Sequence, residues 1–212
     1  MTQQSPMPRF EQFIAIDWSG ARGTRHKGIA VAVVSVGNAA PELVPSPTPA
    51  GWARGEVAAF LEAREGPLLA GFDFSFAPPY VARGTYLPGL ATADNGPGFW
   101  AYVDHHSTDA DYGVASFIEG EARPHFWLGA TDGAKALFLH HRACEMEFNG
   151  HGGGKASTVF DCVGAAQVAK ASFAGMRLLH RLQRNFAIWP FQPAGKRTVV
   201  EIYTRAMLRH AG

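Results

Sequence analysis

Two short apolar runs that each end in a carboxylate are the features that most constrain how this 212-residue chain can fold. Phe13 to Ile16 leads directly to Asp17, and Leu68 to Phe72 leads directly to Asp73. Runs of this length are typical of buried strands, and each is followed by turn residues. Because an unpaired carboxylate is costly to bury, both aspartates require an explanation in the folded protein.

The other periodicities predict a mixed α/β fold. Strands are expected at residues 13–17, 28–36, 41–44, 68–76, 186–191 and 198–203, and helices at 54–64 and 158–185. This order predicts an antiparallel front of three strands, joined by a crossover to a parallel strand. We expect one domain over 1–212, with an insertion after the fourth strand at about 80–154 that holds short helices at 97–105 and 133–138.

Composition limits the class of protein. With 47% hydrophobic residues the chain can bury a core, which excludes disorder as its main state. The longest apolar runs, such as Ile29 to Val34, are too short to span a membrane, so no membrane partner is expected. The first residues lack an apolar secretory core, and Cys144 and Cys162 are widely separated. We therefore expect a cytoplasmic protein with reduced thiols; its oligomeric state is left open.

The net charge of +1 hides an asymmetry, because residues 1–121 carry 7 Lys+Arg against 13 Asp+Glu, whereas residues 122–212 carry 12 against 5. This distribution fits a metal site beside a surface for polyanions. It equally fits two halves that attract each other within one fold.

Three acids within apolar strands predict a metal site. If the first and fourth strands are neighbours, Asp17 and Asp73 lie side by side at the carboxyl ends of the strands, where open α/β sheets bind ligands. Glu201 lies in the last predicted strand. Carboxylate oxygens suit Mg²⁺ or Mn²⁺, which can activate water and stabilise phosphoryl displacement. The alternative is that each acid pairs with an arginine or caps a helix.

The segments FIAIDWSG, KGIAVAVV, GFDFSFAPP and VVEIYTRAM together resemble a predicted nuclease family with a ribonuclease H-like fold. The resemblance extends over most of the chain. It implies a five-stranded mixed sheet with helices on both faces, and metal-dependent hydrolysis of phosphodiester bonds. By motif position, Asp17, Asp73 and Glu201 match the family's acids and are expected to be both metal ligands and catalytic residues.

Ribonuclease H-like nucleases usually carry a further acid on a C-terminal helix, and this sequence ends at Gly212 without one. Asp161 is the candidate substitute. With Thr158 it forms a capping-box-like start for the helix expected at 158–185.

Four residues are expected to bind substrate. Ser19 and Ser75 each follow one of the two aspartates by two positions, and Trp18 is placed to stack a base beside the metal, although a role in the core is the alternative. Lys155 lies in the Gly-rich segment 150–157, which departs from the P-loop pattern but predicts an anion site before a helix. The alternative for this segment is a flexible linker.

Other polar groups favour ordinary roles. Lys170, Arg177, Arg181 and Arg184 line one face of the predicted helix, either against phosphates or, as we favour, in solvent. The pairs at 105–106 and 140–141 lack the spacing of structural zinc sites, so surface or packing roles are expected for these histidines.

The sequence therefore predicts a metal-dependent nuclease with nucleic acid as a partner. The alternative is a non-catalytic ribonuclease H-like module that binds nucleic acid or a protein. The segment IDWSG also resembles the first turn of actin-type and sugar-kinase phosphotransferases, but those enzymes close two such domains around a nucleotide and this chain is long enough for only one. Whether the substrate is DNA or RNA is left open.

Overall fold

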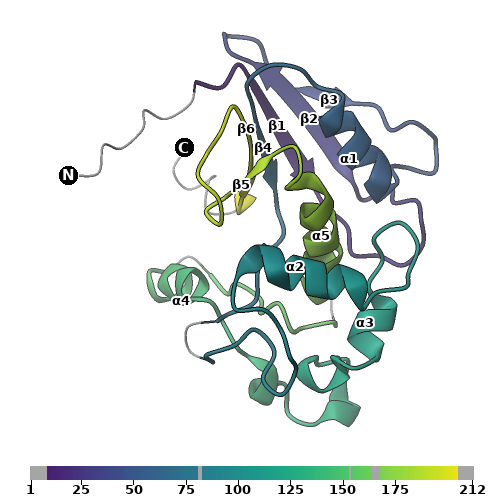
Figure 1. The fold of residues 1–212 in the computed structure, drawn as a ribbon, viewed down its shortest axis with the longest axis vertical. Helices are drawn as coiled ribbons and strands as arrows, with labels where there is room; N and C mark the ends of the chain where they lie inside the picture. The colour runs from purple at the N-terminus through teal and green to yellow at the C-terminus, as the bar shows by residue number, and fades with distance from the viewer. Residues whose placement is uncertain (1–8, 81–82, 153, 164–167, 205–212) are drawn as a thin grey trace.

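The computed structural model describes residues 9–80, 83–152, 154–163 and 168–204, which form a mixed sheet with helices packed against it (Figure 1). The strands are β1 (Gln12–Asp17), β2 (Ala30–Ser35), β3 (Glu42–Val44), β4 (Leu68–Phe72), β5 (Ala187–Trp189) and β6 (Arg197–Glu201). Their order in the sheet is β3-β2-β1-β4-β6-β5. The first three strands are antiparallel, whereas β4 is parallel to β1, and β6 to β4 and β5.

The predicted mixed α/β class and the adjacency of the first and fourth strands are confirmed. The five strands implied by the resemblance are wrong, because the sheet formed by the described residues has six. The additional pairing arises at the edge, where Ala187–Trp189 pairs with β6 after the chain leaves the last helix.

The helices are α1 (Arg54–Glu62), α2 (Gly96–His105), α3 (Ala115–Glu119), α4 (Ala143–Gly150) and α5 (Val168–Leu182), with short 3₁₀ helices η1 (Arg123–His125), η2 (Ala130–Asp132) and η3 (Lys135–Phe138). All of α2 to α4 belong to the segment expected as an insertion. Asn95 caps α2 by accepting a hydrogen bond from the Gly98 N–H at 2.9 Å. The α2 helix packs across α5 (Figure 1), so this segment shares its core with the sheet-bound helix.

The last long helix begins later than the predicted 158–185. Thr158 does not act as a helix cap: its hydroxyl donates to the carbonyl of His140 at 2.6 Å. Asp161 forms a parallel bridge with Trp127, which draws this part of the chain into an extended conformation. Residues 164–167 lie outside the described residues. Among those described, α5 starts at Val168.

The two faces of the sheet differ at β1. Ile14 and Ile16 are buried, whereas Phe13, Ala15 and Asp17 are exposed. Because successive side chains of a strand point to opposite faces, one face is covered here and the other is open. Helices α1 and α5 contact each other over the covered face (Figure 1). The expected helices on both faces are therefore not found at β1 within the described part of the chain.

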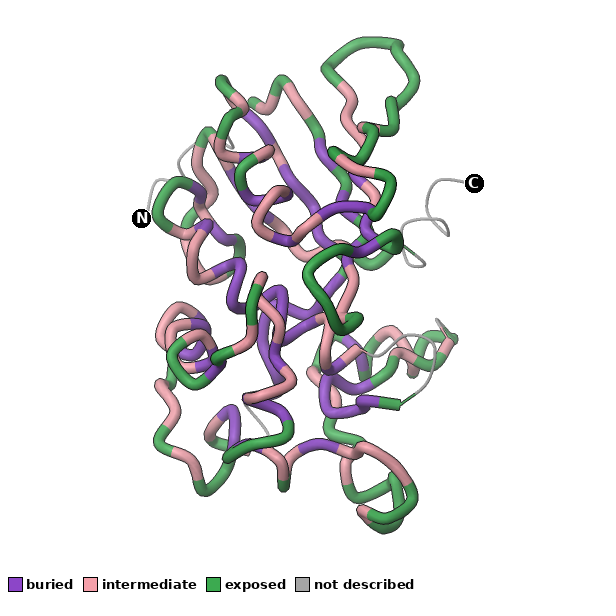
Figure 2. Tube along the Cα trace, turned by 90° about the vertical axis from the view of Figure 1, so that its right-hand side faces the viewer, coloured by how far each residue is buried: buried purple, intermediate pink, exposed green. Residues whose placement is uncertain are grey.

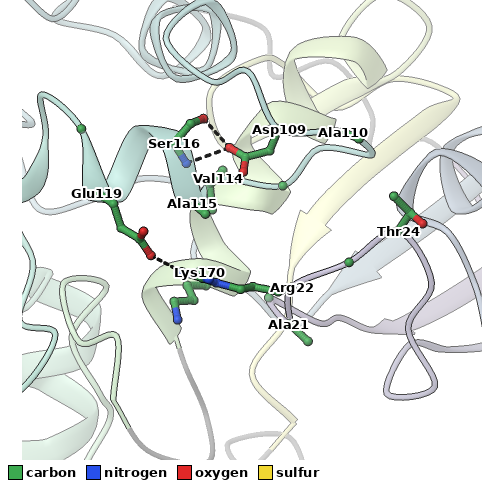
Figure 3. A pocket seen from close by; sticks show the side chains of 14 residues that line it. Ala21, Arg22, Thr24, Asp109, Ala110, Val114, Ala115, Ser116, Glu119 and Lys170 are labelled. Atoms are coloured by element: carbon green, nitrogen blue, oxygen red, sulfur yellow. Dashed lines mark hydrogen bonds and ion pairs between the residues drawn. The ribbon is translucent and has the colours of Figure 1, made fainter.

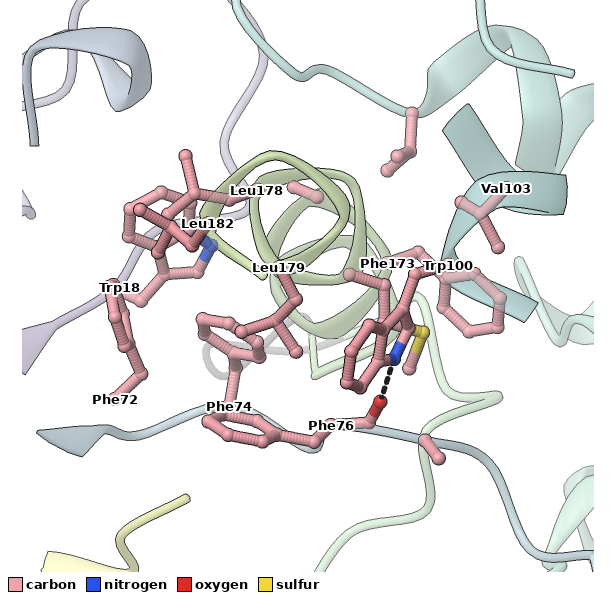
Figure 4. Close-up of a cluster of buried hydrophobic side chains, with 14 of the residues drawn as sticks. Trp18, Phe72, Phe74, Phe76, Trp100, Val103, Phe173, Leu178, Leu179 and Leu182 are labelled. Atoms are coloured by element: carbon pink, nitrogen blue, oxygen red, sulfur yellow. Dashed lines mark hydrogen bonds between the residues drawn. The ribbon is translucent and has the colours of Figure 1, made fainter. Parts of the chain in front are cut away.

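Aromatic residues from two strand ends form the core beneath α5 (Figure 4). Trp18 contacts Phe72 and Phe74, and the Trp18 indole donates to the Ala171 carbonyl on α5 at 3.1 Å. Trp100 of α2 donates to the carbonyl of Phe76 at 2.7 Å (Figure 4). The buried stretches gather in the middle of the molecule and the exposed ones on its outer loops (Figure 2). The core thereby fixes the positions of both segments that carry the aspartates.

Two glycines permit this close packing. A Cβ on Gly20 would lie 2.2 Å from the backbone nitrogen of Ala171, and one on Gly175 would lie 2.2 Å from the ring of Phe74. Both distances are far inside van der Waals contact. The glycine after β1 and the glycine within α5 therefore set how closely the helix approaches the strand ends.

We expect Gly175→Ala to destabilise the protein by about 1–3 kcal/mol, because the added methyl group overpacks a buried aromatic cluster. Helix propensity alone predicts the opposite sign, by roughly 1 kcal/mol. Urea unfolding measures the difference. The matched control is Gly150→Ala at the end of α4, where a Cβ has open space and the expected change is neutral or stabilising. Equal stabilisation of both variants would refute the steric argument.

Candidate functional site

Asp17 and Asp73 lie side by side at the carboxyl ends of two neighbouring parallel strands. In the register of β1 and β4, Ile16 is opposite Phe72, so the next residue on each strand is an aspartate. The backbone N–H of Trp18 donates to Oδ1 of Asp73 at 2.8 Å, and the Asp73 N–H donates to the Ile16 carbonyl at 3.4 Å. These two bonds tie the two strand ends together. The predicted juxtaposition of the two acids is confirmed.

Partial burial and the Asp17 carboxyl both perturb the carboxyl of Asp73. The pKa of Asp73 is raised to about 6, mainly by partial removal from water and further by the charge of Asp17 and a hydrogen bond with it. The N–H groups of Trp18 and of Asp73 itself oppose this shift. Two like charges held together in this way favour binding of a proton or of a cation.

The acid pair lines a cavity of about 290 Å³ on the open face of the sheet. Its floor is made of small residues on β1 and β2, namely Ala15, Ala30 and Ala32. Leu43, Ile202 and Thr204 form the rest of its wall with Ile16. The small floor leaves room above the sheet next to both carboxylates, so a ligand can approach them from solvent.

Glu201 does not join this pair. In the register of β4 and β6, Glu201 is opposite Phe72, whereas Ile202 follows on the level of Asp73. Glu201 therefore points to the opposite face of the sheet from Asp73. There it accepts a two-pronged ion pair from Arg142, at 2.7 and 2.5 Å, and the Phe76 N–H at 2.9 Å. The prediction that Glu201 is a third metal ligand is wrong for this arrangement, and the arginine-paired alternative holds.

Asp161 is also paired elsewhere. One of its oxygens lies 2.5 Å from the ammonium of Lys135, and the other accepts the Val163 N–H at 3.0 Å. Its predicted place at a helix start is wrong, since the residue lies in the bridge with Trp127. Among the residues that the structure describes, no three His, Cys, Asp or Glu side chains gather as ligands of one cation. The acid set here is the pair Asp17 and Asp73.

The four residues expected to bind substrate lie in different environments. Trp18 is buried in the aromatic core and Ser75 is buried as well, so neither side chain is accessible to a substrate in this structure. The Ser75 N–H donates to Ser172 of α5. Ser19 is partly exposed and its hydroxyl accepts the Ala21 N–H at 3.3 Å. Lys155 is exposed on the loop after α4, well before α5 begins, so the expected helix N-terminus does not follow it directly.

The basic face predicted on the long helix is mostly engaged within the protein. Arg177 donates to Asp104 at 2.9 Å, and Arg181 donates to Glu62 at 3.0 and 2.5 Å. Both the phosphate-binding and the solvated interpretations are therefore wrong for these two arginines, which join α5 to α2 and α1.

Sequence reasoning missed a buried arginine that shapes the loop after Asp17. The guanidinium of Arg54 donates to the carbonyls of Ser19, at 3.0 and 2.9 Å, and of Ala21, at 2.8 Å. Asp111 accepts the first N–H groups of α1 and holds a neighbouring loop in place. Burial lowers the pKa of Arg54 to about 10. Its position on the apolar face of α1, with Val57, Ala58 and Leu61, is the signal that could have identified it.

Arg142 was missed for a different reason. It stands before α4 and pairs with Glu145 of that helix at 2.9 Å as well as with Glu201. The local pair is visible in the sequence as an i,i+3 spacing, but the long-range partner depends on how the chain folds.

A second cavity, of about 480 Å³, lies between the loop after β1 and the segment 109–120 (Figure 3). Its acids are engaged: Asp109 accepts hydrogen bonds from Ser116, and Glu119 pairs with Arg22 at 2.5 Å (Figure 3). Lys170 lines the same cavity. Neither Asp17 nor Asp73 contributes to its wall, so it is separate from the acid pair.

The raised pKa of Asp73 predicts a pH-dependent stability. Its ionisation is penalised in the folded state, so stability declines as pH rises through about 6. Asp73→Asn retains an acceptor for the Trp18 N–H and removes the penalty. Because the residue is also exposed, screening limits the expected gain to about 1 kcal/mol at pH 8. Thermal unfolding at pH 8 and pH 4 checks this, and an equal gain at both pH values would contradict it.

No family model, curated protein or solved structure matches this chain. Within the described residues, no helix combines the length and the apolar character needed to cross a membrane. The functional interpretation therefore rests on the geometry of the site.

Proposed function

We propose that this chain is a divalent-metal-dependent phosphodiester hydrolase in which Asp17 and Asp73 hold the cation. The observation that carries the proposal is the adjacency of the two carboxyls at the ends of β1 and β4, beside a solvent-accessible cavity. Ligand sites of open α/β sheets favour this edge. The order of antiparallel and parallel strands supports a ribonuclease H-like fold as part of the same proposal.

The residues present fit a hard divalent cation. Two carboxylates offer oxygen ligands, and a bound cation would relieve the repulsion from Asp17 that, after burial, contributes to the raised pKa of Asp73. When bound, Mg²⁺ or Mn²⁺ would supply Lewis-acid activation of water and neutralise charge on the phosphate. Asp17 and Asp73 would hold the cation, and the Trp18 N–H orients the Asp73 carboxylate. Neither Glu201 nor Asp161 is included, because each has an internal cationic partner.

The shape of the site favours a chain-like substrate over a small enclosed one. The cavity lies on an open sheet face and is floored by alanines, so a nucleic-acid backbone can pass across it. This supports nucleic acid as the substrate class. The free thiols of Cys144 and Cys162 suit the reducing cytoplasm, which we propose as the location.

A second candidate is a non-catalytic ribonuclease H-like module. The ion pair between Glu201 and Arg142 favours this second candidate. With Glu201 engaged, only two acids are left for the metal site, whereas nucleases of this type use more. The two candidates differ in one property: the hydrolase needs the acid pair for turnover, whereas the module binds its partner without consuming it.

Cleavage of labelled single-stranded and duplex DNA and RNA, with Mg²⁺ or Mn²⁺, tests the proposal. We expect cleavage that is lost in Asp17→Asn and after chelation, and retained in Glu121→Gln, an exposed acid beside His106. Binding of nucleic acid without cleavage, at the same affinity in Asp17→Asn, would establish the second candidate instead.

A further inference from the structure

A cluster of basic side chains surrounds the ring of Phe160, away from the acid pair. The guanidinium of Arg83, on the loop after β4, lies 4.9 Å from the centre of this ring. The imidazole of His140 meets the ring edge-on, with centroids 5.9 Å apart. His125, at the end of η1, precedes Phe126, whose ring packs 5.8 Å from Phe160. Arg83 and His140 thus meet at one aromatic ring, and His125 directly precedes a residue that packs against this ring.

These groups lie close enough to repel one another. The pKa of His125 is lowered by burial and then by the charges of Arg83 and His140. The pKa of His140 is lowered by burial, Arg83 and His141. Burial also lowers the pKa of Arg83. Within the described residues no carboxylate pairs with Arg83, His125 or His140, since the neighbouring Arg123 of η1 takes Asp132 as its partner.

The chain at 156–158 is tied to the segment that carries His140. The imidazole Nε2 of His141 lies 3.1 Å from the carbonyl of Ala156, and Thr158 donates to the carbonyl of His140. Lys155, next to Ala156, is exposed here. The contacts of Ala156 and Thr158 fix the chain that carries His140 and His141.

We propose that Arg83, His125 and His140 form a binding site for a phosphate oxyanion. An arginine fork and imidazole N–H groups are the donors that phosphate oxygens accept, and a basic cluster without a carboxylate gains stability when an anion enters it. Arg83 and His125 are half-buried and His140 is exposed, so an ion can reach them from solvent. The site does not depend on the acid pair or on hydrolysis.

The phosphate can come from two sources, free inorganic phosphate or the backbone of a nucleic acid. Titration with inorganic phosphate, followed by NMR of the histidine side chains, tests the shared chemistry. We expect saturable shifts at His125 and His140 and a rise in their pKa values on binding. Because the anion favours the protonated imidazoles, affinity should be about tenfold higher at pH 5.5 than at pH 7.5.

Arg83→Met and His140→Asn are expected to weaken phosphate binding at least about tenfold. Arg64→Met is the matched control, because Arg64 also lies over a phenylalanine ring, that of Phe60 at 4.4 Å. His151→Asn, at an exposed position after α4, controls for the histidine change. Circular dichroism verifies that each variant folds. If Arg83→Met does not fold, His140→Asn still tests the proposal, because it changes an exposed residue.

An oligonucleotide without terminal phosphates separates the two sources. If this oligonucleotide competes with inorganic phosphate, the site binds a nucleic-acid backbone. If the oligonucleotide does not compete, the site binds free phosphate. Either result with the expected variant effects supports the site. Shifts that stay linear up to high phosphate concentration, or that are equal in Arg83→Met and Arg64→Met, would overturn it. Loss of phosphate binding here leaves cation binding at Asp17 untouched, so the two proposals fail separately.

Discussion

We expect Asp17→Asn and Asp73→Asn each to weaken Mn²⁺ binding, as measured by calorimetry, on the order of a hundredfold or more. Each substitution leaves one carboxylate of an adjacent pair, and one carboxylate on an open sheet face is a poor site for a hard cation. The amide keeps the size of the side chain, and Asp73→Asn can still accept the Trp18 N–H. The loss therefore reports on charge rather than on folding.

Glu201→Gln is the informative companion to these variants. We expect this variant to bind Mn²⁺ as the wild type does, because Glu201 lies on the other face of the sheet and pairs with Arg142. Equal loss of binding in Glu201→Gln and Asp17→Asn would restore Glu201 to the metal site. Unchanged binding in Asp17→Asn would remove the acid pair from it.

The pH profile of Mn²⁺ binding provides a second readout. With the pKa of Asp73 at about 6, protons compete with the cation in the acidic range. Affinity should be constant above about pH 7 and fall up to tenfold per pH unit below about 6. In Asp73→Asn, the affinity of any residual Mn²⁺ binding should no longer fall with a midpoint near pH 6. A profile that declines only below pH 4 would show that the two acids do not interact.

Arg54→Met should destabilise the fold by about 3–5 kcal/mol, the largest stability effect expected here. The Arg54 side chain is almost fully buried and its donors satisfy the carbonyls of Ser19, Ala21 and Asp111. Methionine fills much of the space but leaves these buried acceptors without a partner. Urea unfolding measures the loss, which corresponds to about 10 °C or more in a thermal scan.

Arg25→Met is the matched control for Arg54→Met. Arg25 also contacts α1, through Glu56 at 2.6 Å, but its side chain is 37% exposed. Exposed ion pairs contribute at most about 1 kcal/mol, so this variant should unfold close to the wild type. Similar unfolding midpoints for the two variants would mean that the buried carbonyls find other donors.

Local patterns determined most of the elements. The alternation and length of apolar runs predicted five of the strands within a few residues, and the strand at 187–189 as a longer segment. The apolar periodicity of 54–64 predicted α1. The helix expected at 158–185 is present as α5, but its predicted start at Thr158 is wrong because a capping pattern is only a local preference. Tertiary contacts with His140 and Trp127 outweighed it.

By itself, the sequence determined that Asp17 and Asp73 follow two apolar runs that form strands, because apolar runs closed by a carboxylate are a local signal. Only the tertiary structure decided which acids share a face. In the observed pairing of β4 with β6, Ile202 lies level with Asp73, and Glu201 lies one residue earlier on the opposite face. No local pattern specifies the register between strands so distant in sequence. The partners Arg142 and Arg54 were equally hidden, because burial of an arginine depends on carbonyls and carboxylates supplied by remote segments.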